Sequence, residues 1–268
     1  MSKIVLITGG SSGLGKSTGQ YLVKKGSTVY GTSRNPDKFK NFDAFTLIKL
    51  DVADKTSMEV AVKTIIEKEG KIDVLINNAG VGITGPVEET PGEEIVKAFD
   101  TNFHGPLNLI KIVLPHMRNQ KDGLIINITS IAGYMGLPYR GIYSATKGAL
   151  ELITEAMRME IKDFGVKMTN IAPGDFATNI ASGRYHAPVL ENSPYKSSYG
   201  KCLKMMNEHV NSGDDPELVA AMVYRIINTK NPRTHYKVGA FMQKLSIVLK
   251  RILPDKMYEK LLLNHYKL

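Results

Sequence analysis

The sequence is poor in cysteine. Cys202 is the single cysteine in 268 residues, so an internal disulfide framework is excluded. A lone thiol is typical of proteins from a reducing compartment. The first strand-like run begins at Lys3, so we expect no signal peptide. These features predict a cytoplasmic protein.

Long apolar runs are missing too. None approaches the roughly 20 residues that a helix needs to cross a bilayer. The net charge of +9 is concentrated at the end of the chain, where residues 230–268 hold nine basic and two acidic side chains. The first 229 residues are therefore nearly neutral, and nothing in them indicates a nucleic-acid-binding surface. The six histidines lack the spacing of metal ligands, so we expect no metal site.

Short apolar runs alternate along the chain with segments of helical apolar spacing, such as 57–70 and 92–117. We interpret the apolar runs as strands at 3–8, 28–33, 46–51, 73–78, 124–129 and 167–172. Continuous apolar strands between amphipathic helices indicate a parallel sheet that is covered on both faces. With right-handed crossovers, the sequence predicts an α/β fold with a doubly wound parallel sheet, the Rossmann fold.

The first predicted strand runs into the glycine-rich stretch TGGSSGLG, residues 8–15. Ligands of such sheets bind at the carboxyl ends of the strands. Gly9, Gly13 and Gly15 permit a tight turn, a close approach of the backbone to a phosphate, and close packing of the next helix on the strand. The stretch predicts a pyrophosphate-binding turn, with the spacing G-x-x-x-G-x-G in place of the G-x-G-x-x-G fingerprint.

Tyr143 and Lys147, in the stretch YSATK, lie four residues apart in a helical segment and so share one helix face. A nearby ammonium stabilises a phenolate and lowers the tyrosine pKa from its ordinary value of about 10. Such a tyrosine can donate or accept a proton nearer neutral pH. The reaction that fits is reduction of a ketone by a nicotinamide, or its reverse. Ser130, at the end of the preceding strand, would hydrogen-bond the same oxygen.

Seven motifs occur in one order along residues 3–180. They are TGGSSGLG (8–15), LDV (50–52), NNAG (77–80), Asn102 in NFHG, Ser130 after INIT, YSATK (143–147) and PGDFAT (173–178). In this set the chain resembles the classical short-chain dehydrogenases/reductases, and GLPYRGIYSATK (136–147) is similar to their steroid- and retinol-handling branches. The resemblance implies that Lys147 also holds the nicotinamide ribose and that Asn102 anchors a water linking Lys147 to solvent. The expected catalytic residues are Asn102, Ser130, Tyr143 and Lys147.

The second predicted strand ends at Ser33 and Arg34, where an NAD-dependent enzyme of this fold carries an acidic residue. A hydroxyl and a guanidinium suit the 2′-phosphate of NADP instead, so we predict NADP(H) as the cofactor. The resemblance places Asp51 near the adenine; capping of the next helix is the alternative role. The expected cofactor-binding residues are Thr8, Gly9, Ser11, Ser12, Gly13, Leu14, Gly15, Ser33, Arg34, Asp51, Val52, Asn78, Ala79, Gly80, Tyr143, Lys147, Pro173, Gly174, Phe176 and Thr178.

No internal repeat or linker divides the chain, so we predict a single domain over 1–268. Residues 3–180 would hold the cofactor and the catalytic residues. Residues 179–215 lack a clear period and are rich in Ser, Gly, Pro, Asn and Tyr, which predicts a lid over the substrate. Residues 240–268 would form a helical C-terminal extension.

The expected substrate is a hydrophobic secondary alcohol or its ketone, or the corresponding aldehyde, of the steroid, retinoid or long-acyl kind. This expectation rests on an apolar pocket predicted from Met135, Leu137, Pro138, Tyr139, Phe176 and Ile180. A small polar carbonyl is the alternative substrate.

Three other functions stay open. Extended epimerases and dehydratases share Tyr-x-x-x-Lys but resemble G-x-x-G-x-x-G at the phosphate turn, so the glycine spacing argues against them. A non-catalytic NADP-binding regulator typically lacks the tyrosine or the lysine, whereas this chain keeps Tyr143 and Lys147. The intact set of site residues also disfavours a scaffold protein.

We expect a homodimer or homotetramer, because members of the family pair through the helices that fall here at 91–118 and 141–163. The second of these segments carries an apolar stripe that faces either a partner subunit or its own sheet. The stripe is Leu150, Ile153, Met157 and Ile161.

The C-terminal segment 240–268 predicts two short amphipathic helices that are separated at Pro254. The first has Phe241, Leu245, Val248, Leu249 and Ile252 at helical spacing, with Lys244, Lys250 and Arg251 off this stripe; the second begins with Met257, Tyr258, Leu261 and Leu262. Basic amphipathic helices can lie on an anionic membrane surface. We favour the other interpretation, in which both helices pack over the lid or across a subunit interface.

Overall fold

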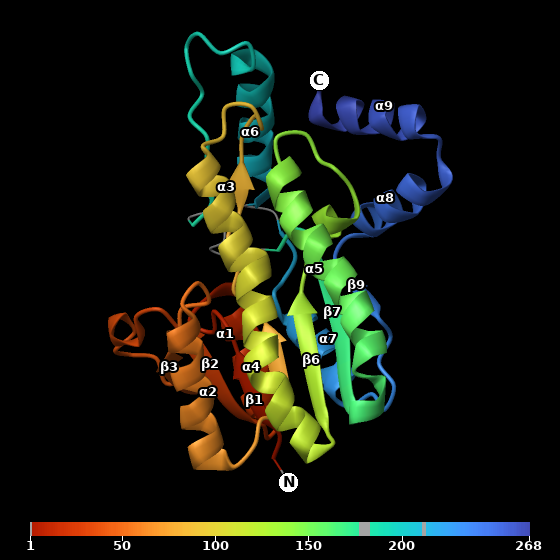
Figure 1. Ribbon diagram of the computed structural model, residues 1–268. Helices are drawn as coiled ribbons and strands as arrows, with labels where there is room; N and C mark the ends of the chain where they lie inside the picture. The colour runs from red at the N-terminus through yellow and green to blue at the C-terminus, as the bar shows by residue number, and fades with distance from the viewer. Residues whose placement is uncertain (1, 177–182, 211–212) are drawn as a thin grey trace.

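The computed structural model describes residues 2–176, 183–210 and 213–268. Within them, seven parallel strands form one sheet in the order β3-β2-β1-β4-β6-β7-β9 (Figure 1). The strands are β1 Ile4–Ile7, β2 Thr28–Ser33, β3 Thr46–Lys49, β4 Val74–Asn77, β6 Gly123–Ile128, β7 Val166–Pro173 and β9 His235–Val238. The strand order changes direction between β1 and β4, which opens a crevice at the carboxyl ends of these two strands.

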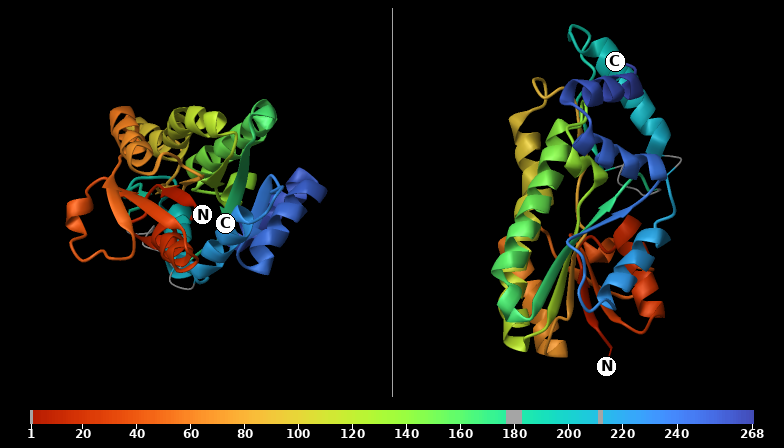
Figure 2. Two further views of the ribbon diagram at one scale, coloured as in Figure 1. Left: turned by 90° about the horizontal axis from the view of Figure 1, so that it is seen from below. Right: turned by 90° about the vertical axis from the view of Figure 1, so that its right-hand side faces the viewer.

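Helices cover both faces of the sheet, as the sequence predicts. α1 Gly13–Lys24 and α7 Glu217–Ile227 lie on one face; α2 Lys55–Glu69, α4 Gly105–Gln120 and α5 Gly141–Glu160 lie on the other (Figures 1 and 2). The doubly wound α/β fold in a single domain is therefore confirmed.

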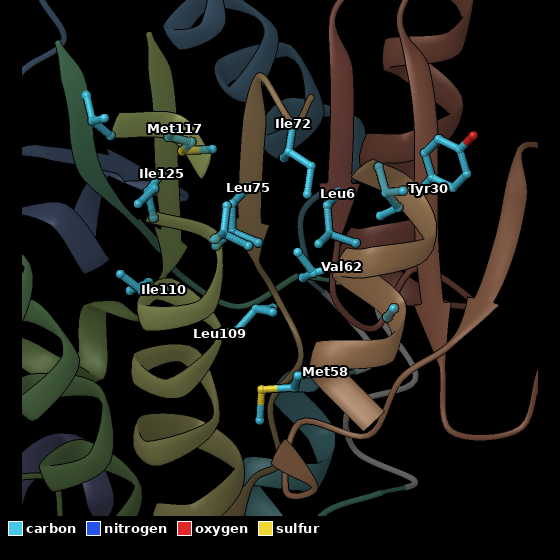
Figure 3. Packing of buried hydrophobic residues seen from close by; sticks show 14 of the residues in the cluster. Leu6, Tyr30, Met58, Val62, Ile72, Leu75, Leu109, Ile110, Met117 and Ile125 are labelled. Atoms are coloured by element: carbon cyan, nitrogen blue, oxygen red, sulfur yellow. The ribbon is translucent and has the colours of Figure 1, made fainter. Parts of the chain in front are cut away.

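The core follows from the two-residue period of the strands. In β1, Val5 and Ile7 point into a cluster with α1 and α7, whereas Leu6 points into the opposite cluster with Val62 of α2 and Leu109 of α4 (Figure 3). All five side chains are buried. Burying an aliphatic side chain of this size contributes about 1.5–3 kcal/mol, so β1 stabilises both helical layers.

All six strands expected from the sequence are present, but the sequence analysis missed β9. Its residues read HYKV; only Val238 is buried, and Tyr236 packs half-buried against the same core cluster. β9 forms the edge of the sheet beside β7, where half-buried positions accept polar side chains. A continuous apolar run, the signal that identified the other strands, is therefore missing here.

Short elements follow the main strands at their carboxyl ends. β5 Ile83–Thr84 pairs in parallel with β8 Tyr185–His186, and α6 Lys196–Val210 comes after β8. Tyr199 of α6 is buried, and its hydroxyl donates to the carbonyl oxygen of Ala187 at 2.9 Å. The same hydroxyl lies 3.3 Å from the carbonyl oxygen of Thr84 in β5, which is a contact between the core and the described part of the predicted 179–215 lid. Its boundaries stay a prediction, as do the other domain boundaries.

The apolar stripe of α5 turns inward. Leu150, Met157 and Ile161 are buried, and Met157 and Ile161 pack in one cluster with Ile125 of β6 and Met168 of β7. The stripe is therefore explained by its own sheet and supplies no argument for a subunit contact.

The C-terminal extension forms two helices, α8 Phe241–Ile252 and α9 Asp255–Tyr266, that break around Pro254 as expected. Ile247 and Tyr258 are buried against Ile131 and Met135, which follow β6. In Figure 1 both helices lie beyond β9 at the end of the sheet where its strands terminate. Within the described ranges, no helix is long and apolar enough to cross a membrane.

Cys202 lies where α9 meets α6. Its side chain is fully buried beside Met206 and Tyr266, and its thiol lies 3.5 Å from the carbonyl oxygen of Tyr266. Burial raises the pKa of the Cys202 thiol above its ordinary value, because the thiolate would lose its hydration.

Candidate active site

The glycine-rich turn after β1 is hydrogen-bonded to β2 on one side and to the segment after β4 on the other. Gly9 and Gly13 adopt left-handed φ angles of +64° and +53°, which glycine tolerates without strain. The amide N–H of Gly9 donates to the hydroxyl of Thr32 in β2 at 3.2 Å. On the other side, the hydroxyl of Thr8 accepts the amide N–H groups of Asn78 and Ala79, both at 2.9 Å. These contacts fix the turn at the crevice between β1 and β4.

A cavity of about 640 Å³ extends from this turn along the carboxyl ends of the strands to Tyr143. Eighteen of the sequence-predicted residues line it: Gly9, Ser11, Ser12, Gly13, Leu14, Ser33, Arg34, Asp51, Val52, Asn78, Ala79, Gly80, Ser130, Tyr143, Lys147, Pro173, Gly174 and Phe176. Thr8, Gly15 and Asn102 are buried and do not line the cavity, but Thr8 and Asn102 hydrogen-bond to residues that do. Thr178 falls outside the described residues.

Tyr143 and Lys147 lie one turn apart on α5, as their spacing predicts. The ammonium nitrogen of Lys147 is 6.0 Å from the centroid of the Tyr143 ring. Lys147 is buried and donates to the backbone carbonyl oxygen of Ile128 at the end of β6, at 3.0 Å. The lysine is thereby held between the tyrosine and the sheet.

Opposing effects act on the pKa of Lys147. Burial lowers the pKa of Lys147 below its ordinary value, because the ammonium loses its hydration. The neighbouring Tyr143 and Glu151 act in the opposite sense and favour the charged form. The lysine therefore keeps its charge most readily when a negative charge, such as a phenolate, lies beside it.

Glu151 is a feature that the sequence analysis missed. It is one helical turn beyond Lys147 on α5 and is buried. Its carboxylate accepts from the hydroxyl of Thr129 and from the side-chain amide of Asn170 (3.2 Å), and lies 2.8 Å from Nδ1 of His235 in β9. The sequence indicated only that Glu151 is four residues from Lys147 and so shares its helix face. The residues that contact the Glu151 carboxylate belong to other segments, at β6, β7 and β9, and could not be paired with it from the sequence.

Asn102 sits in a single π-helical turn, Asp100–His104, that joins α3 Gly92–Phe99 to α4. Such turns are frequent at functional sites. Its side chain is fully buried, accepts from the amide of Val81 at 2.8 Å and donates to the hydroxyl of Thr146 at 3.1 Å. A Cβ on Gly80 would lie 3.2 Å from Asn102 Oδ1 and 3.3 Å from Lys147 Nζ. The asparagine and the lysine thus approach the cavity wall at the same place.

Ser130 follows β6 directly and begins a 3₁₀ turn, Ile131–Tyr134. Its side-chain oxygen accepts the amide N–H of Ala132 at 3.2 Å. The hydroxyl proton is therefore free to point into the cavity that Ser130 and Tyr143 both line. This arrangement can bind a carbonyl oxygen with two hydroxyl donors.

Two arginines and an aspartate line the cavity near Tyr143, and none of the three was expected from the sequence. The guanidinium carbon of Arg140 lies 5.4 Å from the centroid of the Tyr143 ring. Arg184 precedes β8, and a Cβ on Gly82 would lie only 2.8 Å from its Cγ. Asp175 accepts from the side chain of Gln243 at 2.8 Å. Arg184 arrives through the pairing of β8 with β5, which leaves no periodic signal in the sequence.

The cavity does not include the residues between Ser130 and Tyr143 from which an apolar pocket was predicted, so that part of the pocket stays a prediction. Met135, Leu137, Pro138 and Tyr139 do not line the cavity. Tyr139 has a φ of +59° and turns its hydroxyl to Ser198 at 2.7 Å, whereas Met135 is buried beneath α8 and α9. Phe176 does line the cavity, and Ile180 falls outside the described residues.

The residues at the other end of the cavity fit an NADP cofactor. Ser33, Arg34 and Lys38 line it after β2, so two cations and a hydroxyl are available where a 2′-phosphate would lie. Gly9 and Gly13 have no side chains, so a phosphate can approach the backbone of the turn closely. α1 begins at Gly13 with its N-terminus toward the same cavity, which favours a negatively charged group there.

Comparison with known proteins identifies the family. The family model for short chain dehydrogenases matches residues 3–188. The chain is 42% identical to the 3-ketodihydrosphingosine reductase of Bacteroides thetaiotaomicron over 96% of this chain and 95% of that protein. It is 30% identical to the NADPH-dependent 3-dehydrocapnine reductase of Ornithobacterium rhinotracheale, over 99% and 98% of the two chains.

Among solved structures, ElxO with NADP bound has a TM-score of 0.70 at 30% identity, covering 89% of this chain and 97% of that one. Other solved structures of this fold hold NAD. This chain therefore belongs to the short-chain dehydrogenase family, oxidoreductases that interconvert alcohols and ketones.

Proposed function

We propose that this protein uses NADPH to reduce the ketone of a hydrophobic substrate to a secondary alcohol. The observation that carries the proposal is the convergence of Ser130, Tyr143 and Lys147 at one end of a cavity whose other end holds Arg34. The first three can receive a carbonyl oxygen, and Arg34 suits a phosphate.

In the proposed reaction, the bound nicotinamide supplies hydride to the carbonyl carbon. The hydroxyl of Tyr143 donates its proton to the carbonyl oxygen, and the hydroxyl of Ser130 donates a hydrogen bond to the same atom. The ammonium of Lys147 stabilises the phenolate that Tyr143 becomes. Asn102 is proposed to hold the wall against which Lys147 lies, through its hydrogen bonds to Val81.

The preference for NADPH can be reversed at the end of β2. In the double variant Ser33→Asp/Arg34→Ala, a carboxylate replaces the hydroxyl and the guanidinium is removed. We expect the Kd for NADPH to rise by about 100-fold while the Kd for NADH stays equal or falls, because the new charge repels a 2′-phosphate and suits a 2′-hydroxyl. Fluorescence titration of both cofactors measures this. An unchanged ratio of the two Kd values would exclude the NADP assignment.

The substrate class is proposed from the relatives, whose names describe reductases of 3-ketodihydrosphingosine and of 3-dehydrocapnine. We expect turnover of 3-ketodihydrosphingosine, a ketone on a long alkyl chain, to exceed that of small polar ketones by at least about tenfold in kcat/KM. NADPH consumption across a panel of ketones measures it. Turnover confined to small polar carbonyls would contradict the proposal and would agree with the charged lining that Arg140 and Arg184 supply.

We also propose that the protein is a cytoplasmic homodimer or homotetramer. The single, buried thiol supports a reducing compartment. Leu152 and Met159 of α5 are 68% and 69% exposed and offer apolar surface for a subunit contact, in place of the buried stripe on the same helix.

A further inference from the structure

The C-terminal helices α8 and α9 leave an apolar face uncovered. In α8 the exposed or half-exposed residues Phe241, Leu245, Val248 and Ile252 recur at steps of three and four, so they form one stripe. Phe241 is 72% and Ile252 68% exposed. The buried residue of this helix, Ile247, lies on the opposite side, against the 3₁₀ turn after β6. The stripe that sequence alone suggested as core is thus mostly at the surface.

The second helix repeats the arrangement. Met257 and Leu261 of α9 are 56% and 47% exposed and lie four residues apart. Tyr266 is buried on the opposite side of the helix, and Tyr258, which is next to Met257, is buried as well. We call the six residues of the two helices the tail face: Phe241, Leu245, Val248, Ile252, Met257 and Leu261. Both helices lie on the same side of the molecule in the right-hand view of Figure 2.

Basic side chains border the tail face on both helices. Helical spacing puts Lys244 and Arg251 beside the apolar stripe of α8, and Lys260 beside that of α9. Residues 240–268 hold six basic and two acidic side chains. One of the acids, Asp255, pairs with Lys250 at 2.9 Å in the turn between the helices. The border of the tail face is therefore strongly positive.

We propose that the tail face docks the protein on an anionic membrane surface. An apolar stripe with basic residues along its edge matches a helix that lies in the headgroup region, with apolar side chains inserted and cations at the phosphates. A second copy of the chain is a poorer partner, because a two-fold contact would bring the same positive borders together.

The docked position would bring the cavity to the lipid. α8 begins at the cavity wall, where the side chain of Gln243 donates to Asp175 at 2.8 Å. Gln243 also lies so close to Gly174 that a Cβ there would overlap it, at 1.9 Å from Oε1. The first turn of α8 is thus shared by the tail face and the cavity wall, and a ketone dissolved in the bilayer would have a short way to Tyr143.

The test uses the full chain and vesicles of phosphatidylglycerol and phosphatidylcholine in equal parts, with pure phosphatidylcholine for comparison. We expect co-sedimentation with the anionic vesicles at low salt, little with the neutral ones, and a loss of about tenfold or more in partitioning at about 0.5 M salt. The variants Phe241→Ser/Ile252→Ser and Arg251→Glu/Lys260→Glu should each lose about tenfold or more. Because these side chains are exposed, the variants should unfold at the wild-type temperature.

Matched controls carry the same changes elsewhere. Val60→Ser/Val96→Ser removes two apolar residues that are 59% and 58% exposed on α2 and α3, and Lys24→Glu/Lys63→Glu makes the same change of charge. Both controls should bind vesicles like the wild type. No binding to anionic vesicles at low salt, or equal losses in the controls, would overturn the proposal. So would a loss of oligomer mass in light scattering for Phe241→Ser/Ile252→Ser with vesicle binding unchanged, which would make a second copy the occupant.

Discussion

Replacement of Tyr143 by phenylalanine should slow ketone reduction severely and leave NADPH binding nearly unchanged. The change removes one hydroxyl and keeps the ring, which is buried and stacks beneath the guanidinium of Arg140. General acid catalysis contributes about 10²–10⁴-fold to a rate, so kcat should fall by a factor in this range. NADPH consumption with an accepted ketone measures kcat, and fluorescence titration measures the Kd for NADPH.

The matched control is Tyr224→Phe. Tyr224 lies on α7, on the face of the sheet opposite α5, and its ring packs against that of Tyr21 at a tilt of 59°, with centroids 6.0 Å apart. Its phenylalanine variant should reduce the ketone at the wild-type rate. If Tyr143→Phe kept more than about a tenth of the wild-type kcat, a different group would have to supply the proton.

Replacement of Gly15 by alanine should impair both cofactor binding and stability. A Cβ at this position would lie 2.4 Å from the carbonyl oxygen of Gly9 and 2.5 Å from the side-chain nitrogen of Asn78. Both groups belong to segments that line the cavity, so relief of the clash must move the cavity wall. Overpacking of this kind costs about 1–3 kcal/mol of the free energy of unfolding. We expect a lower Tm and a Kd for NADPH raised by at least about tenfold.

Gly92→Ala supplies the comparison, because a Cβ on this first residue of α3 meets nothing within 4 Å. In a helix, alanine is more favourable than glycine by up to about 1 kcal/mol, so its Tm should be unchanged or slightly higher. Wild-type affinity for NADPH in Gly15→Ala would show that the turn can shift without affecting the cofactor site, contrary to its proposed role.

Much of the fold was predictable because most strands read as apolar runs and because glycines mark the turn after the first strand. The central strands β1, β4, β6 and β7 are buried on both faces and so read as apolar runs, and the glycines of the turn mark the point where the first strand meets its helix. The spacing of Tyr143 and Lys147 predicted a shared helix face, which the structure confirms.

The rest depended on contacts between segments far apart in the sequence. Arg184 reaches the cavity only because the two-residue strands β5 and β8 pair, and a strand of two residues has no measurable period. The run from Met135 to Tyr139 lies between two site residues in the sequence, yet it turns away to support α8 and α9. Periodicity locates an apolar face on a helix, but it does not say whether that face is buried in the protein. The apolar stripe of α8, for example, is mostly exposed.

The burial of Cys202 makes the protein convenient for spectroscopy. Maleimide reagents react with an accessible thiolate, and the one thiol of this chain is fully buried with a raised pKa. A cysteine introduced at an exposed position would therefore accept a fluorescent dye or a spin label without removal of the native thiol. A set of such single-site labels along α8 and α9 would report, residue by residue, which parts of this surface contact added vesicles.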